Sequence, residues 1–134
     1  MKFMLMMSAP LQAGATELEV ADWPAEAMEA SVRHCDRVCE ELAETGEYVT
    51  GGGLADPGRA KFVTSRADGS PEVTDGPFAE TKEFLLGYWI IDVESVERAY
   101  EIAARYSAVP GPDGAPANMP IEVREVMTAS SAEA

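Results

Sequence analysis

Residues 84–93 read FLLGYWIIDV, and apolar side chains occupy nearly every position of this stretch. A strand with one solvated face alternates apolar and polar residues, whereas a strand covered on both faces is apolar almost throughout. Tyr88 and Trp89 would point to opposite faces, and both are aromatic. We therefore predict a central strand at residues 84–93 that is covered on both sides.

A long amphipathic helix is predicted at residues 24–45. Pro24 suits the first helical turn, and Gly46 suits the C-terminal stop. At about 100° per residue, one face is apolar and the opposite face is charged. The apolar face comprises Met28, Val32, Cys35, Val38, Cys39 and Leu42. Such a helix packs its apolar face on a sheet.

The remaining predicted elements complete an α+β domain. A second helix follows Ser95, a suitable N-cap, and runs to about Tyr106. Strands are predicted at residues 2–8, 47–51, 60–66, 71–74 and 121–127, with a hairpin turn at Asp68-Gly69. This order matches a ferredoxin-like split βαβ subunit with an extra hairpin. The domain would span residues 1–127, and the polar tail at 128–134 is expected to be disordered.

The two helices of this arrangement cover one face of the sheet. The apolar stretch at 84–93 requires cover on the other face as well. A second copy packed across a two-fold axis supplies it, so we expect a homodimer.

Composition narrows the classes of partner. The chain has 24 acidic and 10 basic residues, giving a formal net charge of -14. Such a surface repels phosphate backbones and anionic membranes, so neither nucleic acid nor membrane is an expected partner. The apolar residues before Ser8 are too few for a signal peptide, which predicts a cytoplasmic location. Cys35 and Cys39 suit a reduced, buried environment. With a single histidine, His34, no metal and no tightly held cofactor are expected.

Residues 73–83 read VTDGPFAETKE. This stretch resembles the signature of the DGPF branch of the YCII-related family, and the resemblance extends through residues 87–93 and 119–127. It implies a dimeric α+β barrel built from ferredoxin-like subunits, with a cleft between sheet and helices or at the dimer seam. It also implies an association with sigma-factor systems.

Several polar residues are candidates for a site. Asp75, Glu80 and Lys82 could contact a polar ligand, although the same segment could be a connector with demanding turn geometry. Because Pro77 offers no N–H, the Asp75 side chain needs another partner, such as an N–H of residues 79–81, Lys82 or a ligand.

His34 lies at the border of the apolar face of the first helix, where it could reach a cleft or stay half-exposed. Related family members pair a histidine of this helix with an aspartate near the last strand. Counting back from Gly46 places that histidine at Cys35 here, and no aspartate stands near Tyr106. Asp75 and His34 are the candidate catalytic residues.

Two further features have alternative interpretations. Tyr88 or Trp89 could form the floor of a cavity, or both could serve packing in the core or dimer. We include Tyr88 among the candidate ligand contacts. Gly51 to Gly53 could approach a phosphate, but no helix start follows them, which favours a bulge or a close strand crossing.

Two functions remain open from the sequence. The first is a small-molecule-binding or regulatory protein linked to a sigma-factor system, as the resemblance implies. The second is a lyase- or isomerase-type enzyme that moves a proton on a small polar or aromatic substrate. The absence of the expected His–Asp pair from the sequence favours binding.

Overall fold

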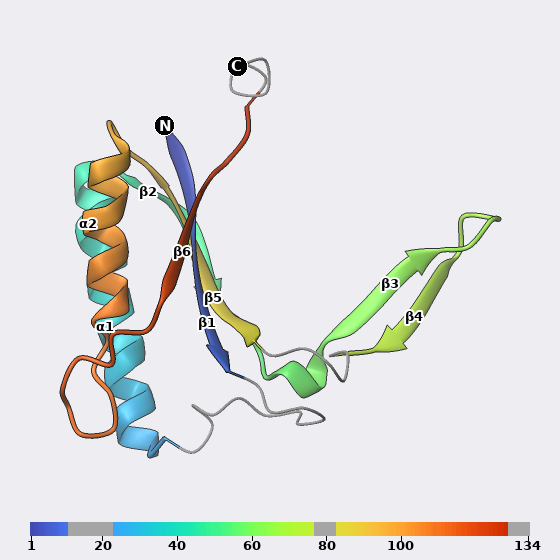
Figure 1. Cartoon of the computed structure of the whole chain (residues 1–134), viewed down its shortest axis with the longest axis horizontal. Helices are drawn as coiled ribbons and strands as arrows, with labels where there is room; N and C mark the ends of the chain where they lie inside the picture. The colour runs from blue at the N-terminus through green and yellow to red at the C-terminus, as the bar shows by residue number, and fades with distance from the viewer. Residues whose placement is uncertain (11–22, 77–82, 129–134) are drawn as a thin grey trace.

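The computed structural model describes residues 1–10, 23–76 and 83–128. They form a layer of strands, a layer of helices and a projecting hairpin that we call the arm (Figure 1). A four-stranded antiparallel sheet has the order β2-β5-β1-β6, and two helices lie on one of its faces. A separate two-stranded hairpin extends from the other side. The described elements follow the predicted order along the chain.

The sheet consists of two crossover units. β1 (Lys2–Pro10) and β5 (Glu83–Asp92) are its central strands, and β2 (Tyr48–Gly53) and β6 (Ile121–Glu125) are its edges. β1, α1 and β2 form one split βαβ unit, and β5, α2 and β6 form the other, as in ferredoxin-like folds.

Alternation along β1 and β5 decides which side chains meet the helices. Leu5 pairs with Trp89, and both are buried on the helix-covered face. Met6 pairs with Tyr88, and both are half-buried on the opposite, uncovered face. The predicted central strand is confirmed. The predicted cover on both of its faces is not present within the monomer, because both helices lie on the same side of the sheet.

The helices begin and end where local chemistry predicts. α1 (Ala25–Thr45) ends at Gly46, whose φ of 80° is accessible at low cost to glycine. α2 (Val96–Ser107) starts after Ser95, whose Oγ accepts a 3.1 Å hydrogen bond from the Arg98 N–H. The predicted caps are confirmed.

The core lies between the helices and the sheet. Its fully buried side chains come from α1, α2, β1 and β5, and burying each contributes about 1.5–3 kcal/mol. They include Leu5, Val38, Leu42, Ile91, Ile102 and Tyr106. The ring of Tyr106 stacks on Trp89 with centroids 3.9 Å apart.

An ion pair also joins the two layers. The Arg98 guanidinium of α2 donates two hydrogen bonds, of 2.8 and 2.9 Å, to the Glu47 carboxylate just before β2. Bidentate geometry of this kind is the stronger form of an arginine–carboxylate contact.

The hairpin projects beyond the body of the molecule. A short 3-10 helix, η2 (Pro57–Arg59), precedes β3 (Lys61–Ser65), which pairs with β4 (Pro71–Asp75). Its turn is closed by Asp68, which accepts a hydrogen bond from the Ser70 N–H, and by Gly69 at φ 86°. The hairpin predicted at Asp68-Gly69 is confirmed.

Several strands differ from their predicted limits. β1 continues to Pro10 instead of ending at residue 8, and β6 ends at Glu125 instead of residue 127. β2 runs through Gly51 and Gly52 to Gly53 instead of ending at residue 51. Glycine is disfavoured in strands, but here Gly51 pairs with Trp89 at a spacing that leaves no room for a Cβ. Contact with a neighbouring strand therefore overrides propensity. The expected disordered tail lies, from residue 129 on, outside the described residues.

None of the helices in the described part of the chain combines the length and apolarity needed to cross a bilayer.

Candidate binding site

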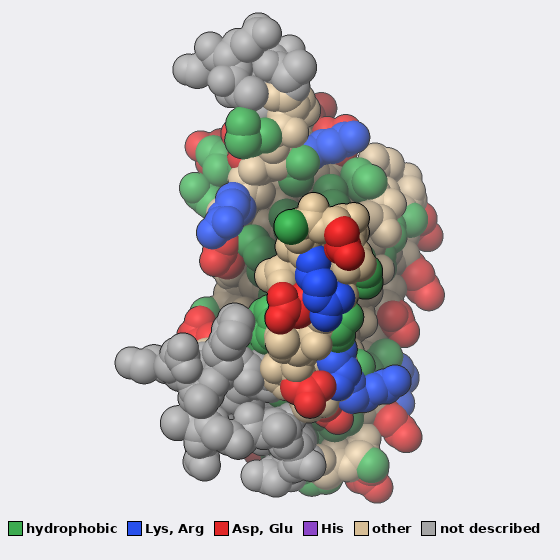
Figure 2. All heavy atoms as spheres, turned by 90° about the vertical axis from the view of Figure 1, so that its right-hand side faces the viewer, with side chains coloured by type: hydrophobic (Ala, Val, Ile, Leu, Met, Phe, Trp, Pro, Cys, Tyr) green, Lys and Arg blue, Asp and Glu red, His purple; other side chains and the backbone are tan. Residues whose placement is uncertain are grey.

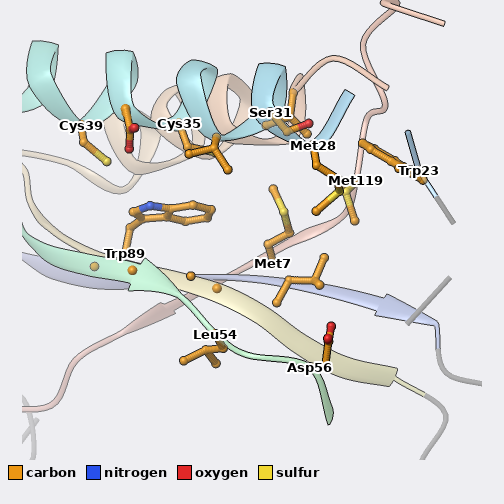
Figure 3. Close-up of a pocket in the computed structure, with 18 of the residues that line it drawn as sticks. Met7, Trp23, Met28, Ser31, Cys35, Cys39, Leu54, Asp56, Trp89 and Met119 are labelled. Atoms are coloured by element: carbon orange, nitrogen blue, oxygen red, sulfur yellow. The ribbon is translucent and has the colours of Figure 1, made fainter. Parts of the chain in front are cut away.

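A cavity of about 420 Å³ lies between α1 and the adjacent β2–β5 half of the sheet (Figure 3). Its volume falls within the range typical of small-molecule sites. We call it the α1 cavity. The described residues that line it are Met7, Trp23, Met28, Ser31, Val32, Cys35, Asp36, Cys39, Tyr48, Gly51, Gly52, Gly53, Leu54, Asp56, Leu86, Gly87, Trp89, Val109 and Met119.

The roof of the α1 cavity is the apolar face of α1. Met28, Val32, Cys35 and Cys39 recur at helical spacing and line the cavity. Met28 is 39% exposed and Val32 is 56% exposed, although both belong to the apolar face. The apolar face therefore extends past the packed core and continues over open space.

The floor is formed by β2 and β5. Gly51 pairs with Trp89 and Gly53 pairs with Gly87, and alternation points these positions toward α1. A Cβ at Gly51 would lie 2.6 Å from the Tyr88 carbonyl oxygen and 2.7 Å from Trp89 Cδ1. A Cβ at Gly53 would have no heavy atom within 4 Å. Close packing thus explains Gly51, whereas Gly53 borders empty space.

Few polar groups border the cavity. Asp56, at the start of η2, points its carboxylate into it (Figure 3), and Asp36 approaches from α1. The Ser31 hydroxyl is engaged, because it donates a 2.9 Å hydrogen bond to the Pro110 carbonyl.

The Cys35 thiol is unsuited to nucleophilic attack. Burial, reinforced by Cys39 and Asp36, raises the pKa of Cys35 to about 11, so it is a neutral thiol at pH 7. Cys39 Sγ lies 3.1 Å from the Tyr106 hydroxyl, and burial and this contact raise the pKa of Tyr106. Burial also raises the pKa of Tyr48. Cys35 and Tyr48, which both line the cavity, therefore present neutral surfaces to it.

The predicted site residues that the structure describes are His34, Asp75 and Tyr88, and they are not brought together. His34 Nε2 lies 2.7 Å from the Arg105 carbonyl oxygen of α2, so its ring turns toward the other helix. Asp75 ends β4 on the arm, where its exposed carboxylate pairs with Lys61 across the hairpin. Lys61 is thus the partner that the Asp75 side chain finds. Tyr88 faces the uncovered side of the sheet.

Glu80 and Lys82 lie outside the described residues, as do the N–H groups of residues 79–81 that were considered as partners of Asp75. Among the residues that are described, no group of three or more His, Cys, Asp or Glu side chains is placed to hold a metal ion.

Sequence reasoning left most of the α1 cavity unassigned. It raised Tyr88 and Trp89 as alternatives for a cavity floor, and Trp89 is the one that lines the α1 cavity. A usable signal was present in the helix, since Met28 and Val32 extend the apolar face beyond the length needed to cover the core. The depth of the space above Gly53 depends on the separation of α1 from the sheet, which no local pattern specifies.

The fold and the cavity together define a class, a small α+β protein with a split βαβ sheet and a cleft beneath its first helix. The chain matches the YCII-related domain over residues 1–124, and it belongs to the YCII-related family.

A stretch of 74 residues is 40% identical to an uncharacterised protein of Rhizobium meliloti (strain 1021). That match covers 51% of this chain and 60% of the relative.

Proposed function

We propose that this protein binds a small organic molecule in the α1 cavity. The observation that carries the proposal is the unfilled, mainly apolar space between Gly53 and the α1 residues Met28 and Val32. Ligand sites are typically concave, largely apolar and equipped with a few convergent polar groups. The α1 cavity has these properties, with Asp36 and Asp56 as its charged groups among the described residues.

The glycines of β2 support this proposal. Glycine within a strand costs roughly 0.5–1 kcal/mol relative to alanine. At Gly51 the close approach of Trp89 accounts for that cost. At Gly53 no described atom would obstruct a side chain, and its backbone does not have the positive φ that favours glycine. A ligand resting on the floor of the cavity would explain why this position lacks a side chain.

Binding is better supported than proton-transfer catalysis. An acid–base mechanism needs two titratable groups within reach of one substrate. His34 contacts a backbone carbonyl and Asp75 pairs with Lys61 on the exposed arm, so these candidates do not meet. The neutral Cys35 thiol, with its pKa of about 11, also does not favour covalent catalysis.

The test is a thermal-shift screen of aromatic amines, alcohols and acids against three proteins. The Gly53→Val variant places a branched side chain in the cavity. Gly52 borders the cavity through its backbone, but it pairs with Tyr88, so Gly52→Val directs the same side chain to the opposite face, also without contacts within 4 Å. A genuine ligand raises the melting temperature by mass action. We expect hits that stabilise wild type and Gly52→Val but not Gly53→Val. The absence of any hit that Gly53→Val abolishes would overturn the proposal.

We also propose that the protein is a homodimer that buries the uncovered face of the sheet. Met4, Met6, Tyr88 and Ile90 alternate onto this face and are half-buried in the monomer. Figure 2 looks at the molecule from this side, with hydrophobic side chains visible around the projecting arm.

The arm supports the same assembly. Val63 and Val73 pair across it and are 61% and 56% exposed. A two-stranded hairpin alone is marginally stable in water, so packing against a second copy would stabilise it. Light scattering at micromolar concentration should give twice the 14.3 kDa chain mass. A monomer mass would contradict this assembly.

Two finer assignments rest on the resemblance. We infer membership of the DGPF branch from the DGPFAETKE stretch at residues 75–83. Association with a sigma factor stays a prediction, and a pull-down of purified sigma factor by the tagged chain would test it.

A further inference from the structure

The charged side chains that line the α1 cavity share one sign. Asp36 and Asp56 are both carboxylates, and the described lining residues include no Lys, Arg or His. Neither aspartate forms an ion pair with another described residue. The described part of the cavity lining therefore carries negative charge without a counter-charge from its own side chains.

The arginines on the same elements as these aspartates do not line the α1 cavity. On α1, Arg33 pairs with Glu29 at 3.9 Å and does not line the cavity. Arg37 of α1 and Arg59 of η2 also lie outside its lining. These arginines belong to the same elements as the two aspartates but do not line the cavity, so no described lining side chain neutralises the carboxylates.

The rest of the lining suits an organic cation. Trp89 lies on the floor, and Trp23 and Tyr48 also contribute aromatic surface. Aromatic faces attract ammonium groups through the ring quadrupole. Met7, Met28 and Met119 offer adaptable apolar surface for the ligand body. The net charge of -14 also raises the local concentration of cations around the whole protein.

We propose that the α1 cavity selects an organic cation, a molecule with an apolar or aromatic body and an ammonium group that lies near Asp36 or Asp56. This inference rests on the proposed binding function and specifies its ligand class. Organic acids of the same shape are disfavoured, because their carboxylates would meet these two aspartates without a counter-charge from the described lining.

Three probes of one shape test the charge preference. They are 4-phenylbutylammonium, 4-phenylbutan-1-ol and 4-phenylbutyrate, which differ mainly in their terminal group. Both tryptophans of the chain line the α1 cavity, so intrinsic fluorescence can report binding directly. At low salt we expect the ammonium to bind roughly three- to tenfold more tightly than the alcohol, and the acid more weakly than either. The advantage should shrink as ionic strength rises.

Variants distinguish the effect of the two cavity carboxylates on binding from the effect of the overall charge of the protein. Asp36→Asn combined with Asp56→Asn should bring the ammonium-to-alcohol ratio close to one while leaving alcohol binding unchanged. Both side chains are exposed, and neither forms a hydrogen bond or an ion pair with another described residue, so the fold should be retained. Glu40→Gln, one turn along α1 and outside the cavity lining, is the control. It removes one charge and should leave the ratio near that of wild type.

The outcomes distinguish this inference from the proposed function. Binding of all three probes with equal affinity, lost in Gly53→Val, would overturn the charge preference and leave the binding function standing. Tighter binding of phenylbutyrate would also overturn it. An ammonium preference that Glu40→Gln reduces as much as the double aspartate variant does would assign the effect to overall charge and contradict the inference. A failure of every probe and every screened compound to bind would remove both proposals together.

Discussion

Tyr88 and Trp89 are consecutive aromatic residues of β5, yet their surroundings differ completely. Trp89 is 6% exposed, stacks on Tyr106 and forms part of the cavity floor. Tyr88 is half-buried opposite Met6 and Gly52, on the face that no helix covers. The residue types are similar, so the side of the sheet decides the role. One face holds the core and the α1 cavity, and the other is available for assembly.

The largest expected difference between the two faces of the sheet is in the stability lost on alanine substitution, which Ile91 and Ile90 compare directly. Ile91 is fully buried beneath the helices, so Ile91→Ala should lower the free energy of unfolding by about 2–5 kcal/mol. Ile90→Ala, on the uncovered face, should cost about 1 kcal/mol at low protein concentration. Urea unfolding measures both.

The same two variants also test the proposed homodimer. In a homodimer the cost of Ile90→Ala should rise with protein concentration, because association stabilises the folded chain by mass action. The cost of Ile91→Ala should not change with protein concentration. Equal losses at all concentrations for both variants would contradict the assignment of the uncovered face to the dimer.

A second contrast lies within β2. Gly51→Val should lower the free energy of unfolding by about 1–3 kcal/mol, because the new Cβ would meet the Tyr88 carbonyl and the Trp89 ring. Gly53→Val should stay within about 0.5 kcal/mol of wild type, since its Cβ enters open space. Melting curves without ligand compare the two. A strongly destabilised Gly53→Val would show that the floor of the cavity is packed.

The smallest expected effect concerns the ion pair between the layers. Hydrogen bonds from Arg98 lower the pKa of Glu47 from 4.5 to about 2. The stabilisation is therefore complete above pH 4.5 and lost as pH falls through 2. Glu47→Gln should cost about 1–2 kcal/mol at pH 7 and flatten this acid dependence.

Glu101→Gln is the matched control, because Glu101 also pairs with Arg98 but is 66% exposed. Its cost should be about 0.5 kcal/mol or less. Denaturant unfolding between pH 2 and pH 7 measures both variants, and equal losses would mean that the bidentate pair adds nothing beyond a surface contact.

Local patterns in the sequence predicted the elements well where local chemistry specifies them. Ser95 caps α2 through its own side chain, Gly46 ends α1 in the left-handed conformation, and Asp68 with Gly69 closes the hairpin. The site residues were harder to predict. Asp75 was singled out for a ligand, but its contact with Lys61 depends on the strand register across the hairpin. The site was predicted from polar residues of a distinctive motif, whereas the cavity is built mainly from apolar side chains and glycines.

By itself, the sequence determined the order of strands and helices, the apolar face of α1 and the two-sided apolar character of β5. These follow from periodicity, caps and turns, which act over a few residues. Tertiary structure alone decided that α1 stands away from the sheet near Gly53, that Trp89 and not Tyr88 faces this space, and that Asp36 and Asp56 border it together. Residues 36, 56 and 89 are distant along the chain, and their meeting depends on how α1 packs over β2 and β5, which no local interaction specifies.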